Sequence, residues 1–144
     1  MDCILEIKQV IAQEVNALQE LAERVNEDYP KAVQLLYTCR GKVIVSGIGK
    51  SGVIARKIAS TMASTGTSSM FLHPTEALHG DLGMVSAEDV LLVISKSGES
   101  MEVNGMLTVA HRIGTKIIAI TSNQNSTMAK ISDVVLYTGN PEEA

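Results

Sequence analysis

Apolar residues recur every three or four positions in the first 25 residues, which is the spacing of one helical face. They are Ile4, Ile7, Ile11, Val15, Leu18, Leu21 and Val25. No Gly or Pro precedes Pro30, so we expect one long amphipathic helix at the start of the chain. Pro30 suits the first turn of a second, short helix through Tyr37, which Gly41 is placed to end.

After Gly41, five short apolar or β-branched runs alternate with helix-like segments. The runs are residues 42–46, 70–72, 90–94, 116–120 and 134–136, and the helical segments are residues 51–64, 99–113 and 126–131. Residues 74–84 are expected to form an irregular loop with at most a short helical turn. Strands that are apolar throughout indicate a sheet covered on both faces. The pattern predicts an α/β fold: a doubly wound, Rossmann-like, five-stranded parallel sheet flanked by helices.

The loops that follow the strands are the candidates for chemistry, because ligands of doubly wound sheets bind beyond the carboxyl ends of the strands. The first strand leads into GIGKSG at residues 47–52, which matches the GxGxxG dinucleotide fingerprint. The second strand ends in FLHP at residues 71–74 and lacks the acid that would hold a ribose. A P-loop would need glycine at position 44, which is Ile44. We therefore expect neither nucleotide motif.

What remains of this segment is a tight turn at a helix N-terminus. Gly49 permits the turn, and Lys50 and Ser51 follow it into the helix. Backbone donors and a cation at that position favour an anionic ligand. The alternative is a turn whose lysine is simply solvated.

The loop after the third strand carries the most informative motif of the chain. Ser95, Ser97 and Ser100 place three hydroxyls at its entry into a helix, with Lys96 and Gly98 between them. Glycine lets a ligand approach the backbone closely, and the helix dipole favours an anion, so the motif predicts a cradle for a phosphate monoester. The alternative is a serine-rich helix cap, but a cap needs only one hydroxyl.

Carboxylates and histidines flank this predicted cradle. Glu99 and Glu102 lie in the first turn of the helix, where the dipole favours acids, and Glu102 is placed to reach the carbon skeleton of the ligand. His79 lies in the loop HPTEALHGDLGM and is predicted either to orient a hydroxyl or to transfer a proton. The alternative is a histidine that is only hydrogen-bonded within the loop. No metal-ligand spacing occurs there, so we expect no metal site.

The overall composition narrows the class of partner. The 144 residues carry a net charge of −4, with no Trp, one Phe and no basic cluster, which argues against nucleic acid. No apolar run reaches the length of a membrane span, and the N-terminus lacks the basic residues of a signal peptide. We expect a cytoplasmic protein without a membrane partner. Cys3 and Cys39 lack CxxC spacing and are expected to be buried, reduced thiols.

These motifs together resemble one family. GIGKSG, STGT, HPTEALHGDLGM, SKSGES and the final EEA are similar to the sugar isomerase (SIS) domain of D-arabinose-5-phosphate isomerases, from residue 41 onward. The resemblance implies interconversion of D-ribulose 5-phosphate and D-arabinose 5-phosphate through an enediol, for 3-deoxy-manno-octulosonate in lipopolysaccharide or capsule. It also implies a homotetramer that requires no cofactor. SKSGES resembles the phosphate-binding signature of SIS domains, and Gly49 and Ser51 would assist it.

Residue by residue, the resemblance implies that Lys50, Glu102 and Glu143 are active-site positions and that His79 belongs to the substrate loop. Either glutamate would serve as the base. A fourth family position, a histidine in an HPGGALG-like segment, has no counterpart in the sequence. Residues 1–144 are thus expected to be one SIS domain that is incomplete at its C-terminus and lacks CBS domains. Residues 1–40 would supply N-terminal helices and residues 41–144 the α/β core.

Two other functions stay open at this point. SIS domains also occur in regulators, so the chain could be a sugar-phosphate-binding module without catalysis. It could also be an isomerase of another sugar phosphate, which would differ in pocket size. In each case we expect a homo-oligomer, because the apolar stripe of the N-terminal helix and part of the sheet would otherwise be bare.

Overall fold

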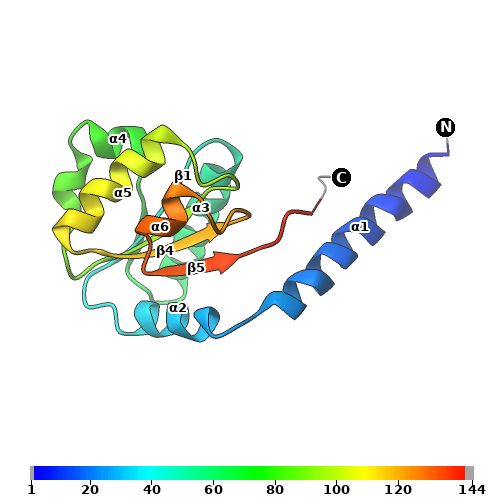
Figure 1. Ribbon diagram of the computed structural model, residues 1–144, viewed down its shortest axis with the longest axis horizontal. Coiled ribbons are helices and arrows are strands. Elements are labelled where there is room, and N and C mark those ends of the chain that lie inside the picture. Colours follow the sequence, from blue (N-terminus) through cyan, green and yellow to red (C-terminus); the bar gives the residue numbers. More distant parts are fainter. Residues whose placement is uncertain (1, 142–144) are drawn as a thin grey trace.

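The computed structural model describes residues 2–141 and contains one five-stranded sheet with helices on both faces (Figure 1). The strands are β1 (Val43–Gly47), β2 (Ser69–Phe71), β3 (Val90–Ile94), β4 (Lys116–Thr121) and β5 (Val134–Tyr137). The helices are α1 (Cys3–Arg24), α2 (Asp28–Tyr37), α3 (Lys50–Ser64), α4 (Pro74–Leu78), α5 (Met101–Ile113) and α6 (Thr127–Ile131), with a 3₁₀ helix η1 (Asp81–Met84). The five predicted strands and the long first helix are confirmed.

The strand order is β2-β1-β3-β4-β5, and every neighbouring pair is parallel. The chain winds from β1 to β2 in one direction and then returns to place β3 on the other side of β1. The order therefore reverses between β1 and β3, which is the topological switch point where ligands of such sheets bind. The predicted doubly wound fold is confirmed, and it brings the two glycine- and serine-rich loops to the same edge of the sheet.

The core has two layers because successive strand residues point to opposite faces. On one face, residues such as Ile44, Leu91 and Ile117 pack against α4, α5 and α6. On the other face, Val43 and Val45 and their neighbours pack against the small residues of α2 and α3. Both faces are covered, as the continuous apolar strands predict, and this holds the strand ends that carry the loops.

Three local expectations need correction. The second helix has Pro30 in its first turn and ends at Tyr37, as predicted, but its C-cap is Thr38 and not Gly41. Residues 74–84 form α4 and η1 and are more regular than an irregular loop, because His73 caps α4 and Pro74 starts it. Neither thiol is fully buried: Cys3 is exposed because α1 has no packing partner near its start, and Cys39 is half-buried.

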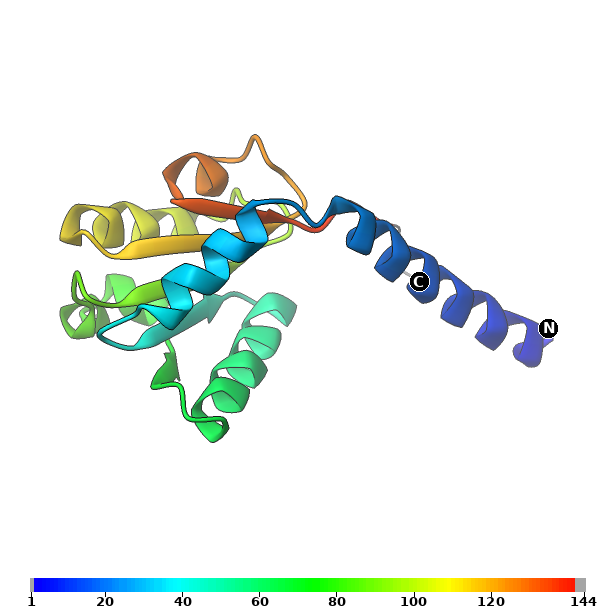
Figure 2. The ribbon, with the colours of Figure 1, turned by 90° about the horizontal axis from the view of Figure 1, so that it is seen from below.

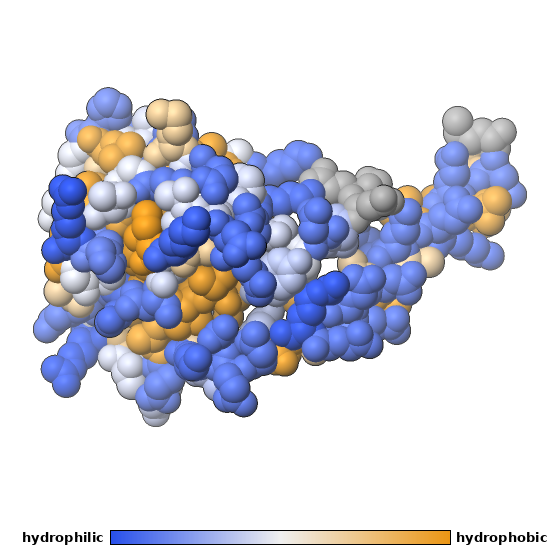
Figure 3. All heavy atoms as spheres, in the orientation of Figure 1, coloured by the Kyte–Doolittle hydropathy of each residue, from blue (hydrophilic) through white to orange (hydrophobic). Residues whose placement is uncertain are grey.

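Helix α1 extends away from the sheet and its helices, as two perpendicular views show (Figures 1 and 2). None of its residues is buried, and the apolar stripe faces solvent, with Ile4 68% and Leu18 65% exposed. Hydrophobic surface also lies between α2 and α6, beside the edge strand β5 (Figure 3). No helix within residues 2–141 combines the length and the apolarity that a membrane crossing needs. The exposed apolar stripe expected on the first helix is therefore present, whereas the sheet itself is covered on both faces.

Candidate active site at the sheet switch point

The turn from β1 into α3 is built by glycines that let strand and helix approach closely. A Cβ on Gly52 would lie 2.8 Å from the carbonyl oxygen of Gly47, and one on Gly47 would lie 3.0 Å from the backbone of Ser51. Gly49 has φ +59°, a conformation that favours glycine. These glycines pack the strand against the helix, and they leave the Lys50 side chain exposed at the start of α3.

Residues 95–100, here called the serine loop, join β3 to α5 at the same edge of the sheet. The loop is fixed by hydrogen bonds from three segments. The Asn123 side chain donates to the carbonyl of Ser97 at 3.2 Å. The backbone N–H of Met128 and the Asn104 side chain both donate to the carbonyl of Gly98. The loop is therefore held in shape before any ligand binds.

Gly98 is required by this arrangement. It has φ +67°, and an added Cβ would collide with the Ser126 side chain. Ser126 cannot withdraw easily, because it is buried and its hydroxyl accepts from the Ala129 N–H as the cap of α6. Glycine is thus the residue that lets the serine loop lie against α6.

The hydroxyl oxygens of Ser95 and Ser97 accept hydrogen bonds from the backbone of the loop. The Ser95 Oγ accepts from the Gly98 N–H at 3.1 Å, and the Ser97 Oγ accepts from the Glu99 N–H at 3.2 Å. An oxygen used as an acceptor in this way keeps its own proton for donation to a ligand. The N-terminus of α5, a 13-residue helix, begins directly after the loop. Hydroxyl donors and a helix N-terminus together favour an anion such as a phosphate.

Ser100 has a different partner from the other two serines. Although it is the N-cap residue of α5, its side chain makes no capping hydrogen bond and donates to Glu102 at 3.1 Å. Ser100 is therefore not used as a side-chain cap of α5. Hydrogen bonds from its own backbone N–H and from Ser100, together with nearby His73, hold the pKa of Glu102 below its ordinary 4.5. Glu102 is therefore ionised at neutral pH, as a general base must be.

The other acid of this segment has a structural role. The Glu99 carboxylate accepts from the Thr127 N–H at 2.9 Å. Hydrogen bonding from the Thr127 side chain first, and from its backbone second, lowers the pKa of Glu99. Glu99 therefore links the serine loop to the start of α6. Lys96 is exposed, and its backbone carbonyl accepts from the Thr121 hydroxyl and from the Ser122 N–H, which tie the loop to the end of β4. Of Glu99 and Glu102, only Glu102 accepts no hydrogen bond from the backbone of another element within residues 2–141.

The two histidines of the segment after β2 occupy different places. His73 lies two residues after the end of β2, at the carboxyl edge. His79 is exposed at the far end of α4, where its backbone N–H donates to the carbonyls of Thr75 and Glu76. The sequence motifs singled out His79, whose role stays a prediction, and did not single out His73. The signal that could have found His73 is its position between a strand and Pro74, which marks a helix start at the ligand edge.

Glu143 lies outside the described residues, so its predicted role has no structural counterpart here. Among residues 2–141, no cluster of three or more His, Cys, Asp or Glu side chains could hold a metal ion. The candidate site at the switch point therefore comprises Lys50, Ser51, the serine loop and Glu102, with His73 on the neighbouring strand, and their roles stay predictions.

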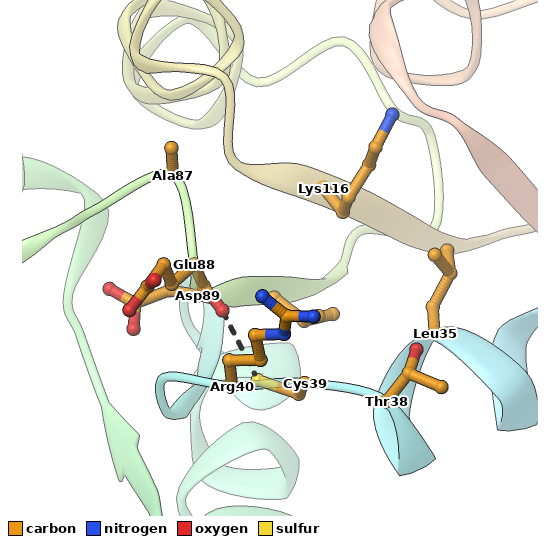
Figure 4. Close-up of a pocket in the computed structure, with 9 residues that line it drawn as sticks. Leu35, Thr38, Cys39, Arg40, Ala87, Glu88, Asp89 and Lys116 are labelled. Atoms are coloured by element: carbon orange, nitrogen blue, oxygen red, sulfur yellow. Dashed lines mark hydrogen bonds between the residues drawn. The ribbon is translucent and has the colours of Figure 1, made fainter.

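A separate hollow of about 300 Å³ lies at the opposite edge of the sheet (Figure 4). It is lined by charged groups of both signs, including Arg40, Glu88 and Lys116. Lys116 is already paired with Asp133 at 2.7 Å. This edge carries the amino ends of the strands, where ligands of doubly wound sheets are not expected. The site is therefore assigned to the switch point and not to this hollow.

Comparison with known proteins identifies relatives for most of the chain. The SIS domain family model matches residues 35–144. Arabinose 5-phosphate isomerase KpsF of Escherichia coli CFT073 is 47% identical over 134 residues, which are 92% of this chain and 41% of that protein. Arabinose 5-phosphate isomerase KdsD of Escherichia coli K12 is 47% identical over 137 residues, 95% of this chain and 42% of that protein. The chain thus spans about two fifths of the length of these relatives.

Solved structures show the same fold. An Escherichia coli CFT073 protein in complex with arabinose 5-phosphate superposes with a TM-score of 0.90 at 40% identity, covering 96% of this chain and 73% of that one. A Bacteroides fragilis protein described as a phosphosugar isomerase involved in capsule formation superposes with a TM-score of 0.91 at 43% identity, covering 96% of this chain and 74% of that one. The switch-point geometry, the family match and these structures agree, and the chain belongs to the SIS domain family.

Proposed function

We propose that this chain is an aldose–ketose isomerase that interconverts D-ribulose 5-phosphate and D-arabinose 5-phosphate. The observation that carries the proposal is the serine loop at the switch point, where the Ser97 hydroxyl is exposed and the ionised Glu102 lies in the first turn of the helix that follows. A phosphate at the loop would fix one end of the sugar and place its other end near the carboxylate. The similarity to arabinose 5-phosphate isomerases supports this substrate.

The reaction moves one proton between neighbouring carbons, so it needs a base and a group that stabilises negative charge on oxygen. Glu102 is the base that the described residues offer, and Glu143 is the alternative outside them. The Lys50 ammonium, at the N-terminus of α3, would stabilise the oxygens or the phosphate. A phosphate held at the serine loop would orient the reacting carbons toward the base. A metal or organic cofactor is not required by this scheme, and the charged substrate fits a cytoplasmic enzyme.

Purified chain should convert arabinose 5-phosphate into ribulose 5-phosphate, measured by the appearance of the ketose. The Lys50→Ala variant is expected to lower kcat/KM about 10²-fold or more, since it removes a charge that stabilises the transition state. The control is Lys57→Ala on the exposed side of α3, where the ammonium contacts the Thr61 hydroxyl at 3.3 Å. An unchanged rate in Lys50→Ala would remove Lys50 from the mechanism.

The same assay separates catalysis from simple binding. Tight binding of arabinose 5-phosphate without turnover, in both this chain and a longer version of it, would favour a non-catalytic sugar-phosphate module. Faster turnover of a hexulose or heptose phosphate would favour another SIS isomerase.

We also propose that the protein is a homo-oligomer, a tetramer by family resemblance, in which copies of α1 cover one another. The stripe on α1 exposes several large apolar side chains along one helix face, and a contiguous exposed apolar patch marks an interaction surface. Sedimentation velocity at micromolar concentration should show an oligomer. Ile11→Glu, in the stripe, should shift it toward smaller species, whereas Gln9→Glu, on the polar side of the same helix, should not. A well-behaved wild-type monomer would contradict the proposal.

A further inference from the structure

His73 is placed at the switch point by the pairing of β2 with β1. The backbone N–H of Leu72 donates to the carbonyl of Val45 at 3.0 Å, so the pairing continues past the end of β2. His73 therefore lies level with Gly47, the residue that opens the turn to Lys50. The serine loop is one strand further along. Two strand spacings separate it from His73, about 10 Å, a separation that a pentose phosphate anchored at the loop can bridge.

The His73 ring is held by two contacts. Its Nδ1 accepts from the Thr75 N–H at 3.2 Å as the cap of α4, and its edge meets the Phe71 ring with centroids 6.3 Å apart. Phe71 is itself covered by the Arg56 guanidinium, 3.9 Å from its centroid. Because Nδ1 accepts a hydrogen bond, the proton of the neutral imidazole resides on Nε2. Within residues 2–141, the His73 Nε2–H has no hydrogen-bond acceptor.

The helix that His73 caps is packed against the helix that carries Glu102. Helix α4 contacts α5, and a Cβ on Gly105 would already lie 3.4 Å from the Leu78 side chain. The two groups are close enough for His73 to be one of the influences that lower the pKa of Glu102. The fixed packing therefore keeps an N–H donor and a carboxylate base on the same side of the switch point.

We propose that His73 is a further catalytic residue of the isomerisation, donating from Nε2–H to the oxygens of the reacting carbons. This inference rests on the proposed function and adds a residue to it. Glu102 takes the proton from the carbon beside the carbonyl, and the electron pair of the broken C–H bond forms the C=C bond of an enediolate. The negative charge develops on the former carbonyl oxygen, which Nε2–H stabilises. The neighbouring hydroxyl proton passes to that oxygen, and Glu102 returns its proton to the other carbon.

The first test is kinetic and uses a variant that preserves the fold. Asparagine is a good helix cap, so His73→Asn keeps an acceptor for the Thr75 N–H while removing the Nε2–H. The expected result is a loss of about 10²-fold in kcat with little change in KM. The matched control is His111→Asn, because His111 is exposed in the last turn of α5. Wild-type kcat in His73→Asn would overturn the proposal.

The second test is binding, followed by NMR of the imidazole rings, and it does not depend on turnover. The chain has only three histidines, so each ring can be assigned by substitution. Arabinose 5-phosphate should shift both the Gly98 amide and the His73 ring, whereas inorganic phosphate should shift the amide alone. A shifted amide with an unmoved His73 ring under arabinose 5-phosphate would overturn the role of His73 and leave the proposed function standing. No shift of either signal would overturn both.

Discussion

Replacing Glu102 by glutamine is expected to lower kcat for the interconversion of the two pentose phosphates by about 10²- to 10⁴-fold. The amide can still accept a hydrogen bond from Ser100, which is 3.1 Å from the carboxylate, so the start of α5 should keep its shape. What is lost is the negative charge that takes the proton from carbon. KM should change little, because the proposed phosphate site is the serine loop and not Glu102. Steady-state kinetics in both directions would measure the effect.

The matched control is Glu99→Gln, three residues earlier in the chain. Its side-chain oxygen can still accept from the Thr127 N–H, and the proposed reaction gives Glu99 no proton to transfer. Near-normal kcat is therefore expected. Glu143→Gln supplies the other comparison, since the sequence left the choice of base between the two glutamates. If Glu102→Gln keeps its rate and Glu143→Gln loses it, the base is Glu143 and Glu102 has no part in the proton transfer.

The fold could be predicted because its signals are local and strong. Each strand is an unbroken apolar run, such as 90–94, and such runs are typical of a sheet buried on both faces. The N-terminal helix follows from apolar spacing alone. Once a doubly wound sheet is predicted, the carboxyl edge of the strands follows as the place to look for a site. This is why GIGKSG and the serine loop can be predicted to be neighbours although they lie far apart in the sequence.

Other features of the site depend on contacts that no local pattern encodes. Whether His73 or His79 lies at the switch point depends on where β2 stops pairing with β1 and α4 begins. Similarly, the sequence alone does not distinguish the three serines of the loop. In the structure, Ser100 donates to Glu102, whereas Ser95 and Ser97 accept from the backbone. The register of one short strand and the rotamer of one side chain decide these points, and both are set by tertiary packing.

The largest effect on stability is expected at the opposite edge of the sheet, for Asp89→Ala. Asp89, which is labelled in Figure 4, lines the hollow at this edge. It is 2% exposed, and its carboxylate accepts from the Lys42 N–H, the Lys42 ammonium and the Ser86 N–H at 2.8–2.9 Å. Removing it leaves these donors without their partner, so the free energy of unfolding should fall by about 3 to 5 kcal/mol. Urea denaturation would measure the loss.

The control for this variant is Asp28→Ala, which breaks the exposed pair with Lys31 at 2.9 Å. An exposed pair of this kind contributes less than about 1 kcal/mol to stability, so the urea midpoint of Asp28→Ala should hardly move. Gly41 gives a second indication that the Asp89 carboxylate is a fixed part of the fold, because a Cβ there would collide with it. Similar losses of unfolding free energy in Asp89→Ala and Asp28→Ala would contradict the prediction that the buried Asp89 contributes more to stability than an exposed acid.

Acid is expected to remove the contribution of Asp89. Burial raises the pKa of Asp89, but hydrogen bonds from Lys42 and Ser86 and the charge of Lys42 outweigh burial and hold it below 3.8. A carboxyl with a lower pKa when folded stabilises fully above its unfolded pKa, and this stabilisation is lost as pH falls through the folded value. Between about pH 7 and about pH 3, the free energy of unfolding should therefore fall more for wild type than for Asp89→Asn. Equal falls would show that Asp89 titrates alike in the folded and unfolded chain.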